Sequence, residues 1–166
     1  MIGVVSRRFS QGGATANAWR RLLFVGPVAG VVVLTAADPN SIPGPLNASV
    51  LDVVDGDTIV VSARIWLGQT VETRVRIAGV DAPEIQGRCP EEIDLAVRAR
   101  DLVAAKLVGG KAVLRQVRFG KYAGRVVARV TAPDGADLTN ALIAAGLGRT
   151  SADGRRLPWC GANAGR

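Results

Sequence analysis

The chain has no histidine and only two cysteines, Cys89 and Cys160. Without histidines or further thiols, these two cysteines cannot form a zinc site. The cysteines either form a disulfide or remain free thiols, and the redox state of the compartment decides between these alternatives. The sequence also lacks any segment that combines low hydrophobicity with high charge, which excludes a long disordered region.

Apolar residues are plentiful enough to build a core. The chain has 166 residues, 48 % of them hydrophobic, which predicts one domain with one modest core. Its formal net charge is +7, but four arginines precede residue 22, and without them 17 basic and 14 acidic residues leave +3. A weakly basic domain suits a polyanionic partner, because lysine and arginine release counterions from phosphates.

An apolar run of 16 residues, Leu22–Ala37, follows directly on Arg20 and Arg21. The run ends in the small residues Thr35-Ala36-Ala37. A basic flank, a short apolar stretch and a small-residue end are typical of a secretory signal, with Ala37 as the cleavage residue.

Two other interpretations of this run stay open. It is shorter than the ~20 residues that span a bilayer comfortably, but 21 residues precede it, which is long for a signal and keeps an uncleaved membrane anchor as an alternative. A buried helix of the domain ranks third, because Gly26-Pro27 would break a soluble helix. We therefore expect residues 1–37 to be a signal peptide or a membrane anchor, and the protein to be periplasmic, secreted or membrane-attached. Export favours a Cys89–Cys160 disulfide.

The rest of the chain divides into a linker, a folded unit and a tail. Three prolines between residues 38 and 46 indicate the linker. The folded unit is expected over residues 47–160, and the tail over 161–166.

Within the folded unit, hydrophobic alternation and turn residues predict five strands, at 48–54, 58–67, 70–77, 111–118 and 125–131. One helix should begin at Pro90 and stop at Gly109-Gly110, and a second should cover Asp137–Ala145, capped by Asp137 and closed by Gly146. This order is typical of a five-stranded barrel of the OB type with two packed helices, a mainly β, α+β fold.

The third predicted strand separates apolar from charged side chains. Apolar or β-branched residues at 71, 73, 75 and 77 alternate with Glu72, Arg74 and Arg76. Because successive strand residues point to opposite faces, one face should pack on the core and the other should carry charge.

Carboxylates gather at two predicted strand ends. Asp55-Gly56-Asp57 joins the first two strands and, taken alone, indicates a tight turn. Asp81-Ala82-Pro83-Glu84 follows the third strand, and Arg76 lies five residues before Asp81 on its polar face. Ca²⁺ takes oxygen ligands from carboxylates and backbone carbonyls, so Asp57, Asp81 and the carbonyl of Ala82 form a candidate ligand set.

The remaining residues have the chemistry that phosphodiester hydrolysis needs. Glu84 would accept a proton from an attacking water, and Arg76 would pair with a phosphate. Arg125, at the head of the fifth predicted strand, is the candidate for a second arginine that stabilises transition-state charge. Taken alone, Arg125 would be an ordinary exposed strand arginine.

Taken together, these residues resemble the thermonuclease family, whose best-known member is staphylococcal nuclease. The resemblance covers Asn47 to about Arg149. Four segments carry it: Val54-Asp55-Gly56-Asp57-Thr58, Arg76-Ile77-Ala78-Gly79-Val80-Asp81-Ala82-Pro83-Glu84, Lys121-Tyr122-Ala123-Gly124-Arg125, and residues 138–147. The resemblance implies an OB barrel with packed helices. It also implies endonucleolytic cleavage of DNA and RNA that leaves 3′-phosphate and 5′-hydroxyl ends.

The resemblance also implies a role for each site residue. Asp57, Asp81 and the carbonyl of Ala82 would bind Ca²⁺, although oxygen ligands also suit Mg²⁺ or Mn²⁺. Arg76 and Arg125 match the two phosphate-binding arginines of the family, and Glu84 matches its general base. Lys121 and Tyr122 match residues that contact a terminal phosphate of the nucleotide.

Two departures from the family pattern stand out. Ala123 is inserted between Tyr122 and Gly124, which affects the match of Lys121 and Tyr122 more than that of Arg125. The chain ends soon after Cys160, so the long C-terminal helix of the family is expected to be absent. A Cys89–Cys160 bond would join this tail to the loop after Glu84, and disulfides typically contribute ~2–4 kcal/mol.

The leading hypothesis is therefore an exported, monomeric, Ca²⁺-dependent nuclease that acts on DNA and RNA. The alternative is a catalytically inactive module of the same fold that binds nucleic acid or protein outside the cytoplasm. Inactive modules usually lose the metal and arginine positions. The enzyme is favoured because this chain retains all five of these residues: Asp57, Arg76, Asp81, Glu84 and Arg125.

Overall fold

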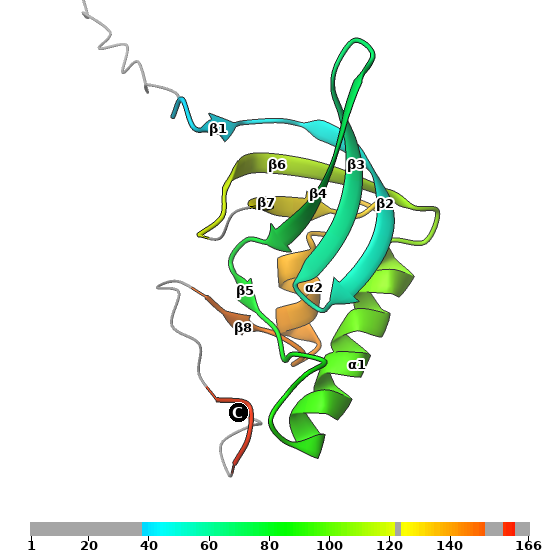
Figure 1. The fold of residues 1–166 in the computed structure, drawn as a ribbon. Coiled ribbons are helices and arrows are strands. Elements are labelled where there is room, and N and C mark those ends of the chain that lie inside the picture. The colour runs from blue at the N-terminus through cyan, green and yellow to red at the C-terminus, as the bar shows by residue number, and fades with distance from the viewer. Residues whose placement is uncertain (1–37, 122–123, 152–157, 162–166) are drawn as a thin grey trace, which may run out of the picture. The chain divides into compact units, whose positions relative to one another are not determined.

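Five long strands close into a barrel (Figure 1). An antiparallel meander consists of β2 (Leu46–Asp55), β3 (Thr58–Trp66) and β4 (Gln69–Ile77). β6 (Lys111–Phe119) pairs with both β2 and β7 (Arg125–Thr131), and β7 pairs in parallel with β4, which completes the closure. The five-stranded, mainly β barrel predicted from the order of elements is confirmed.

The structure is a computed structural model that describes residues 38–121, 124–151 and 158–161. Two helices, α1 (Pro90–Lys106) and α2 (Leu138–Ala144), accompany the barrel. Three two-residue strands complete the fold: β1 (Ser41–Ile42), β5 (Val80–Asp81) and β8 (Arg149–Thr150). β1 pairs with β6, so part of the segment expected to be a linker joins the sheet. Among the described residues, no helix has the length and hydropathy to cross a membrane.

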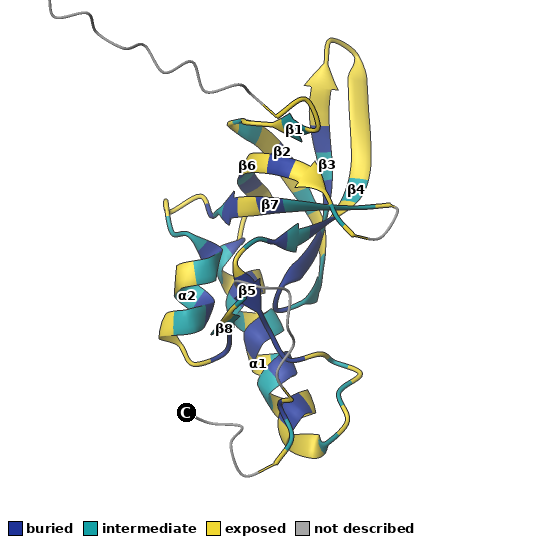
Figure 2. Ribbon diagram, turned by 90° about the vertical axis from the view of Figure 1, so that its left-hand side faces the viewer, coloured by how far each residue is buried: buried dark blue, intermediate teal, exposed yellow. Residues whose placement is uncertain are grey.

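The core fills the barrel and the space between the barrel and the two helices, whereas the outer half of the β3–β4 hairpin is exposed (Figure 2). Val75 and Ile77 of β4 are buried, as the alternation of this strand predicts. Val71 on the same face is 42 % exposed, which contradicts that prediction. The hairpin extends beyond the strands that would cover it, and its tip exposes Trp66 and Leu67.

α1 begins and packs through local sequence features. Pro90 occupies its first turn, and Glu91 and Glu92 lie at the positive end of the helix dipole. The residues that it buries against the barrel include the small Ala96 and Ala99. Small side chains let the helix axis approach the turn between β2 and β3 closely.

Gly56 occupies the point of closest approach. A Cβ atom at this position would lie 2.6 Å from the Cβ of Ala99 and 3.0 Å from the Cβ of Ala82. The turn, α1 and the loop after β5 therefore meet around a residue that must lack a side chain. This contact brings the Asp55-Gly56-Asp57 turn against the segment that carries Asp81.

α2 holds the turn that precedes Asp81. Its N-terminus is capped by Asp137, whose carboxylate accepts a hydrogen bond from the backbone N–H of Asn140 at 3.1 Å, as the sequence predicts. Thr139 donates to the carbonyl of Ala78 at 2.7 Å. The turn between β4 and β5 is thereby held against α2.

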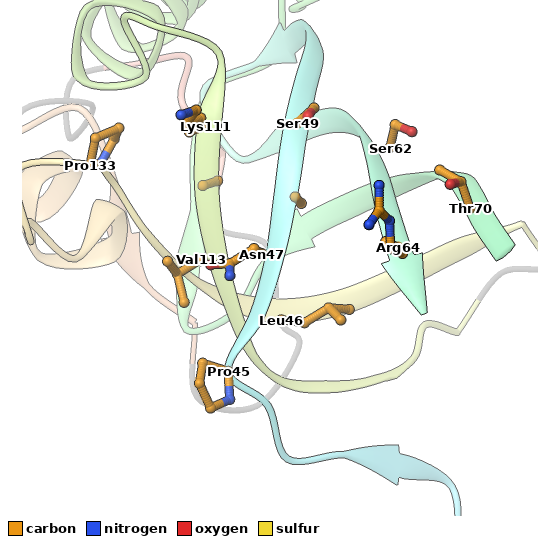
Figure 3. Close-up of a pocket in the computed structure, with 12 residues that line it drawn as sticks. Pro45, Leu46, Asn47, Ser49, Ser62, Arg64, Thr70, Lys111, Val113 and Pro133 are labelled. Atoms are coloured by element: carbon orange, nitrogen blue, oxygen red, sulfur yellow. The ribbon is translucent and has the colours of Figure 1, made fainter. Parts of the chain in front are cut away.

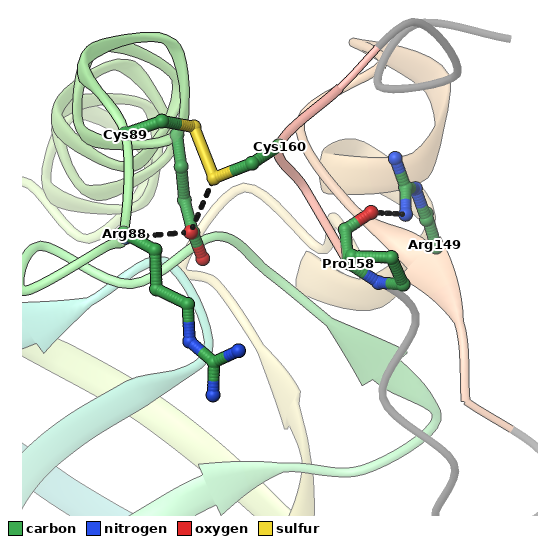
Figure 4. Close-up of a disulfide and its surroundings, with 6 residues drawn as sticks. Arg88, Cys89, Arg149, Pro158 and Cys160 are labelled. Atoms are coloured by element: carbon green, nitrogen blue, oxygen red, sulfur yellow. Dashed lines mark hydrogen bonds between the residues drawn. A yellow bond between two sulfur atoms is a disulfide. The ribbon is translucent and has the colours of Figure 1, made fainter.

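The disulfide between Cys89 and Cys160 joins the start of α1 to the C-terminal segment, as expected (Figure 4). Trp159, next to Cys160, is buried, and the guanidinium of Arg149 lies 3.8 Å from the centre of its ring. Arg149 also donates to the carbonyl of Pro158 at 3.1 Å. Residues 158–161 are thus held covalently, by packing and by a hydrogen bond.

We predict that Gly56→Ala will destabilise the protein by about 1–3 kcal/mol, because overpacking forces the turn away from α1. Urea unfolding would measure the change. Combining Gly56→Ala with Ala99→Gly removes the Cβ of Ala99, the closer of the two carbons that the new methyl group would meet. The double variant should therefore regain part of the loss, although glycine in a helix itself costs about 1 kcal/mol. Wild-type stability of the Gly56→Ala variant would contradict this account.

We also predict that replacing both cysteines by serine will lower the free energy of unfolding by about 4 kcal/mol. The bond closes a loop with a sequence separation of 71, and the loop-closure entropy of a chain of that length gives this magnitude. Thermal or denaturant unfolding would measure it. Wild-type protein treated with a reductant is the matched control and should unfold at the same midpoint as the variant. Identical midpoints for the oxidised wild type and the variant would show that the bond does not stabilise the fold.

Candidate active site

The centre of the site is one arginine shared by two aspartates. The Nη1 atom of Arg76 donates to Asp57 Oδ1 at 3.0 Å, and its Nη2 atom lies 2.9 Å from Asp57 Oδ2. The same Nη2 atom donates to Asp81 Oδ1 at 3.2 Å. The three residues that the sequence analysis grouped from spacing therefore meet through their side chains.

Strand register produces this meeting. Thr58 and Arg76 are direct cross-strand partners on β3 and β4, so Asp57 lies at the end of β4 as well as at the start of β3. The backbone N–H of Ile77 donates to the carbonyl of Asp57 at 2.8 Å and fixes this end of the hairpin. Beyond Ile77, the two-residue turn Ala78-Gly79 leads into β5, which carries Asp81.

Asp57 and Asp81 are both buried, at 2 % and 5 % exposure. Asp57 accepts further hydrogen bonds from the hydroxyl of Thr58 at 2.9 Å and from the backbone N–H of Ala82 at 3.1 Å. Burial nevertheless raises the pKa of Asp57 above its ordinary value, against the opposing effects of Arg76 and these hydrogen bonds. The ionised carboxylate is therefore less stable in the fold than in water. Ionisation of Asp57 therefore lowers the free energy of unfolding as the pH rises above the ordinary pKa of an aspartate. A bound cation would offset that cost.

These oxygens fit a hard divalent cation. A single nitrogen, Arg76 Nη2, lies near one oxygen of each aspartate, so the two carboxylates face a common point. Ala82 is buried next to them, and its N–H already contacts Asp57. Ca²⁺ accepts carboxylate and carbonyl oxygens in flexible geometry at about 2.3–2.6 Å. Asp57, Asp81 and Ala82 are the residues that would hold it.

Glu84 lies on the exposed loop that follows β5, three residues after Asp81. Two acids hold this loop in place. Asp55 accepts from the backbone N–H of Ile85 at 3.4 Å, and Glu92 accepts from that of Arg88 at 3.0 Å. A cavity of about 550 Å³ separates the loop from the C-terminal segment, with Glu84 and Trp159 among its lining residues. Glu84 therefore sits on a loop that is anchored at both ends.

The anchoring role of Glu92 could not be predicted from the sequence. Its position predicts an ordinary glutamate in the first turn of a helix, but the residue is only 8 % exposed. Its Oε2 atom accepts from Arg88 and lies 3.4 Å from the sulfur of Cys160, a contact rather than a hydrogen bond, since a disulfide sulfur has no proton. The ligand atoms of Cys89, Glu92 and Cys160 lie within 4.8 Å of one another. They do not form a metal site, because the Cys89–Cys160 disulfide leaves no thiolate.

Arg125 opens β7 beside β4, two register positions from Arg76. Its direct partner on β4 is Arg74, whereas Arg76 faces Val127. A hollow of about 620 Å³ is lined by Arg74, Arg125, Asp55 and Thr58. Lys121 is exposed at the end of the described segment, and Tyr122 and Ala123 lie outside the described residues. The structure thus brings Arg125 to the same end of β4 as the aspartates.

Comparison with known proteins agrees with this geometry. Residues 74–156 match the family model described as staphylococcal nuclease homologue. The matched range contains Arg76, Asp81, Glu84 and Arg125 but begins after Asp57, which the structure adds to the cluster. No curated protein matches the chain. Because the family model covers half of the 166 residues, the chain belongs to the staphylococcal nuclease family.

Proposed function

We propose that the protein is an exported Ca²⁺-dependent endonuclease that hydrolyses DNA and RNA to 3′-phosphate and 5′-hydroxyl ends. One observation carries the proposal: two buried carboxylates converge on one nitrogen of Arg76, in a chain of the nuclease family. A purely structural role for this cluster would be costly, because burying two acids opposite one arginine leaves negative charge uncompensated.

The roles follow from position. When bound, Ca²⁺ would supply positive charge that polarises the phosphate and stabilises its transition state. Arg76, released from one or both aspartates, would bind a phosphate oxygen through its planar fork. Glu84 would take the proton of the attacking water, and Arg125 would neutralise charge that develops on the phosphate. Lys121 and Tyr122 would bind a terminal phosphate of the nucleotide.

Export rests on separate observations. Residues 1–37 contain the basic flank and apolar run of a signal or anchor. Disulfides persist in oxidising compartments, and Cys89 and Cys160 are joined. We therefore place the domain, residues 47–160, outside the cytoplasm, as a monomer that is either free or attached through its N-terminus.

The first test is metal dependence. Purified protein incubated with single-stranded DNA should cleave it in Ca²⁺ and lose at least 100-fold in rate with a calcium-specific chelator, because Asp57 and Asp81 would then lack their cation. Mg²⁺ and Mn²⁺ serve as comparison ions. End-labelled products would show whether the phosphate stays on the 3′ side. Absence of Ca²⁺-dependent cleavage would favour an inactive binding module of the same fold.

The second test concerns the catalytic groups. Glu84→Gln and Arg125→Ala should each lower kcat by about 10²–10⁴-fold, the usual contribution of a general base or a charge-stabilising group. Glu91→Gln and Arg98→Ala are matched controls on α1, and both should retain wild-type kcat. Thermal melting would establish that all four variants fold. Near-normal turnover in Glu84→Gln or Arg125→Ala would remove that residue from the mechanism.

A further inference from the structure

The polar face of the β3–β4 hairpin runs unbroken from the aspartate cluster toward the tip. Direct cross-strand partners in an antiparallel pair share a face, and so do alternate residues of one strand. Four successive pairs therefore lie on one face: Thr58 with Arg76, Val60 with Arg74, Ser62 with Glu72, and Arg64 with Thr70. The first pair contains Arg76 of the candidate active site. The last pair lies six residues farther along β4, about 20 Å away at the rise of a strand.

Two neighbouring strands widen this face near the tip. Ser49 of β2 pairs with Ser62 of β3 on one side and with Lys111 of β6 on the other. A groove of about 970 Å³ lies here; Lys111 lies beside Ser49 on the side away from Ser62, and Arg64 follows Ser62 along β3 (Figure 3). Asn47 and Thr70 also line it. Its polar lining side chains can all donate a hydrogen bond.

Next to the aspartate cluster, β7 widens the face on the other side of β4. Arg125 is the direct partner of Arg74, and both line the 620 Å³ hollow beside Thr58. The hollow and the groove thus occupy successive stretches of one face. Between them they place three exposed or half-buried arginines and one lysine on the same face as Arg76: Arg74, Arg125, Arg64 and Lys111.

Three basic side chains of this face have no protein partner among the residues that the structure describes. Within the described part of the chain, no ion pair or side-chain hydrogen bond engages Arg64, Arg74 or Lys111, whereas Lys106 and Arg129 pair with Asp134 and Asp137 at 3.0 and 3.2 Å. Arg115 and Arg118 of β6 are also unpaired among the described residues. The acids that share the face are Glu72, Asp52 opposite Val60, and Asp55 opposite Thr58. Outside the aspartate cluster, four basic residues and three acids therefore leave the face a positive excess of one charge.

We propose that this face, which we call the strand track, binds the single-stranded substrate chain beyond the scissile phosphate. The inference rests on the proposed nuclease function. Arg74 would contact one phosphate, and Arg64 and Lys111 would contact phosphates farther along. Asn47, Ser49, Ser62 and Thr70 would donate hydrogen bonds to phosphate and sugar oxygens, the usual backbone contacts of such side chains.

The chemistry of the track also indicates the form of the substrate. Among the described residues that line the groove and the hollow, none is aromatic, so these residues offer contacts to the sugar–phosphate backbone rather than stacking platforms for bases. Recognition would then depend little on base sequence. Asp57 and Asp81 are buried, so a phosphate must reach into the fold to meet them. A flexible single strand can do this more readily than a duplex, whose persistence length is about 150 base pairs.

The test measures binding without turnover. Full-length protein in a metal chelator would be titrated against fluorescently labelled oligothymidylates of two to twelve nucleotides, with fluorescence polarisation as the readout. Affinity should rise with length. Arg64→Ala and Lys111→Ala should each weaken binding of the twelve-nucleotide chain by about fivefold at 0.1 M salt. Each should also make the slope of log binding constant against log salt concentration less steep by about 0.7, the value for one phosphate contact on a single strand. Both should leave dinucleotide affinity unchanged, and Arg98→Ala should match wild type throughout.

Three results would overturn the proposal: no binding of the long chain, unchanged affinity in Arg64→Ala and Lys111→Ala, or an equal loss for the dinucleotide and the long chain. The last result would point to a general effect on the fold. Failure of the proposed nuclease function is a separate outcome. A protein that binds long chains through Arg64 and Lys111 but cleaves nothing in Ca²⁺ would retain the track without the activity. A protein that cleaves DNA with no length-dependent binding would retain the activity without the track.

Discussion

The shared guanidinium of Arg76 is the interaction on which this end of the protein depends. Two acids in a buried position repel each other, and one arginine keeps them together. Its one positive charge is shared by two carboxylates, and burial still raises the pKa of Asp57 beside it. The cluster of two acids and one arginine is therefore short of one positive charge. Phosphate binding by Arg76 would increase that deficit, so binding of a divalent cation and binding of a phosphate by the same arginine support one another.

Small residues make this arrangement possible. The turn that carries Asp57 can approach α1 only because position 56 has no side chain and position 99 has only a methyl group. The site is therefore located where barrel, helix and loop meet closely, and not in the 970 Å³ groove farther along the β3–β4 hairpin. Close packing suits a metal site, since the ligands must be held in place before the ion arrives.

Much of this could be predicted from local sequence. Strand boundaries, the start of α1 and the Asp137 cap each depend on a few adjacent residues, and all three predictions are confirmed. The grouping of Asp57, Arg76 and Asp81 was predicted because each lies at a strand end, where register brings distant residues together. Glu92 was missed, since its role depends on a loop and a disulfide that pack over it after folding. Val71 was wrongly assigned to the core, because alternation specifies a face of a strand and not whether anything covers it.

The disulfide has a topological consequence. It turns the chain from Cys89 to Cys160 into a covalent ring that contains α1, β6, β7, α2 and β8. A single peptide cut anywhere in that ring leaves both products joined through sulfur, so one proteolytic event cannot release Arg125 from the rest of the molecule. Asp57, Arg76 and Asp81 precede the ring in the chain. The proposed site is therefore assembled from a linear segment that carries the acids and a cyclic segment that carries the second arginine, and only the linear part can be removed by one cleavage.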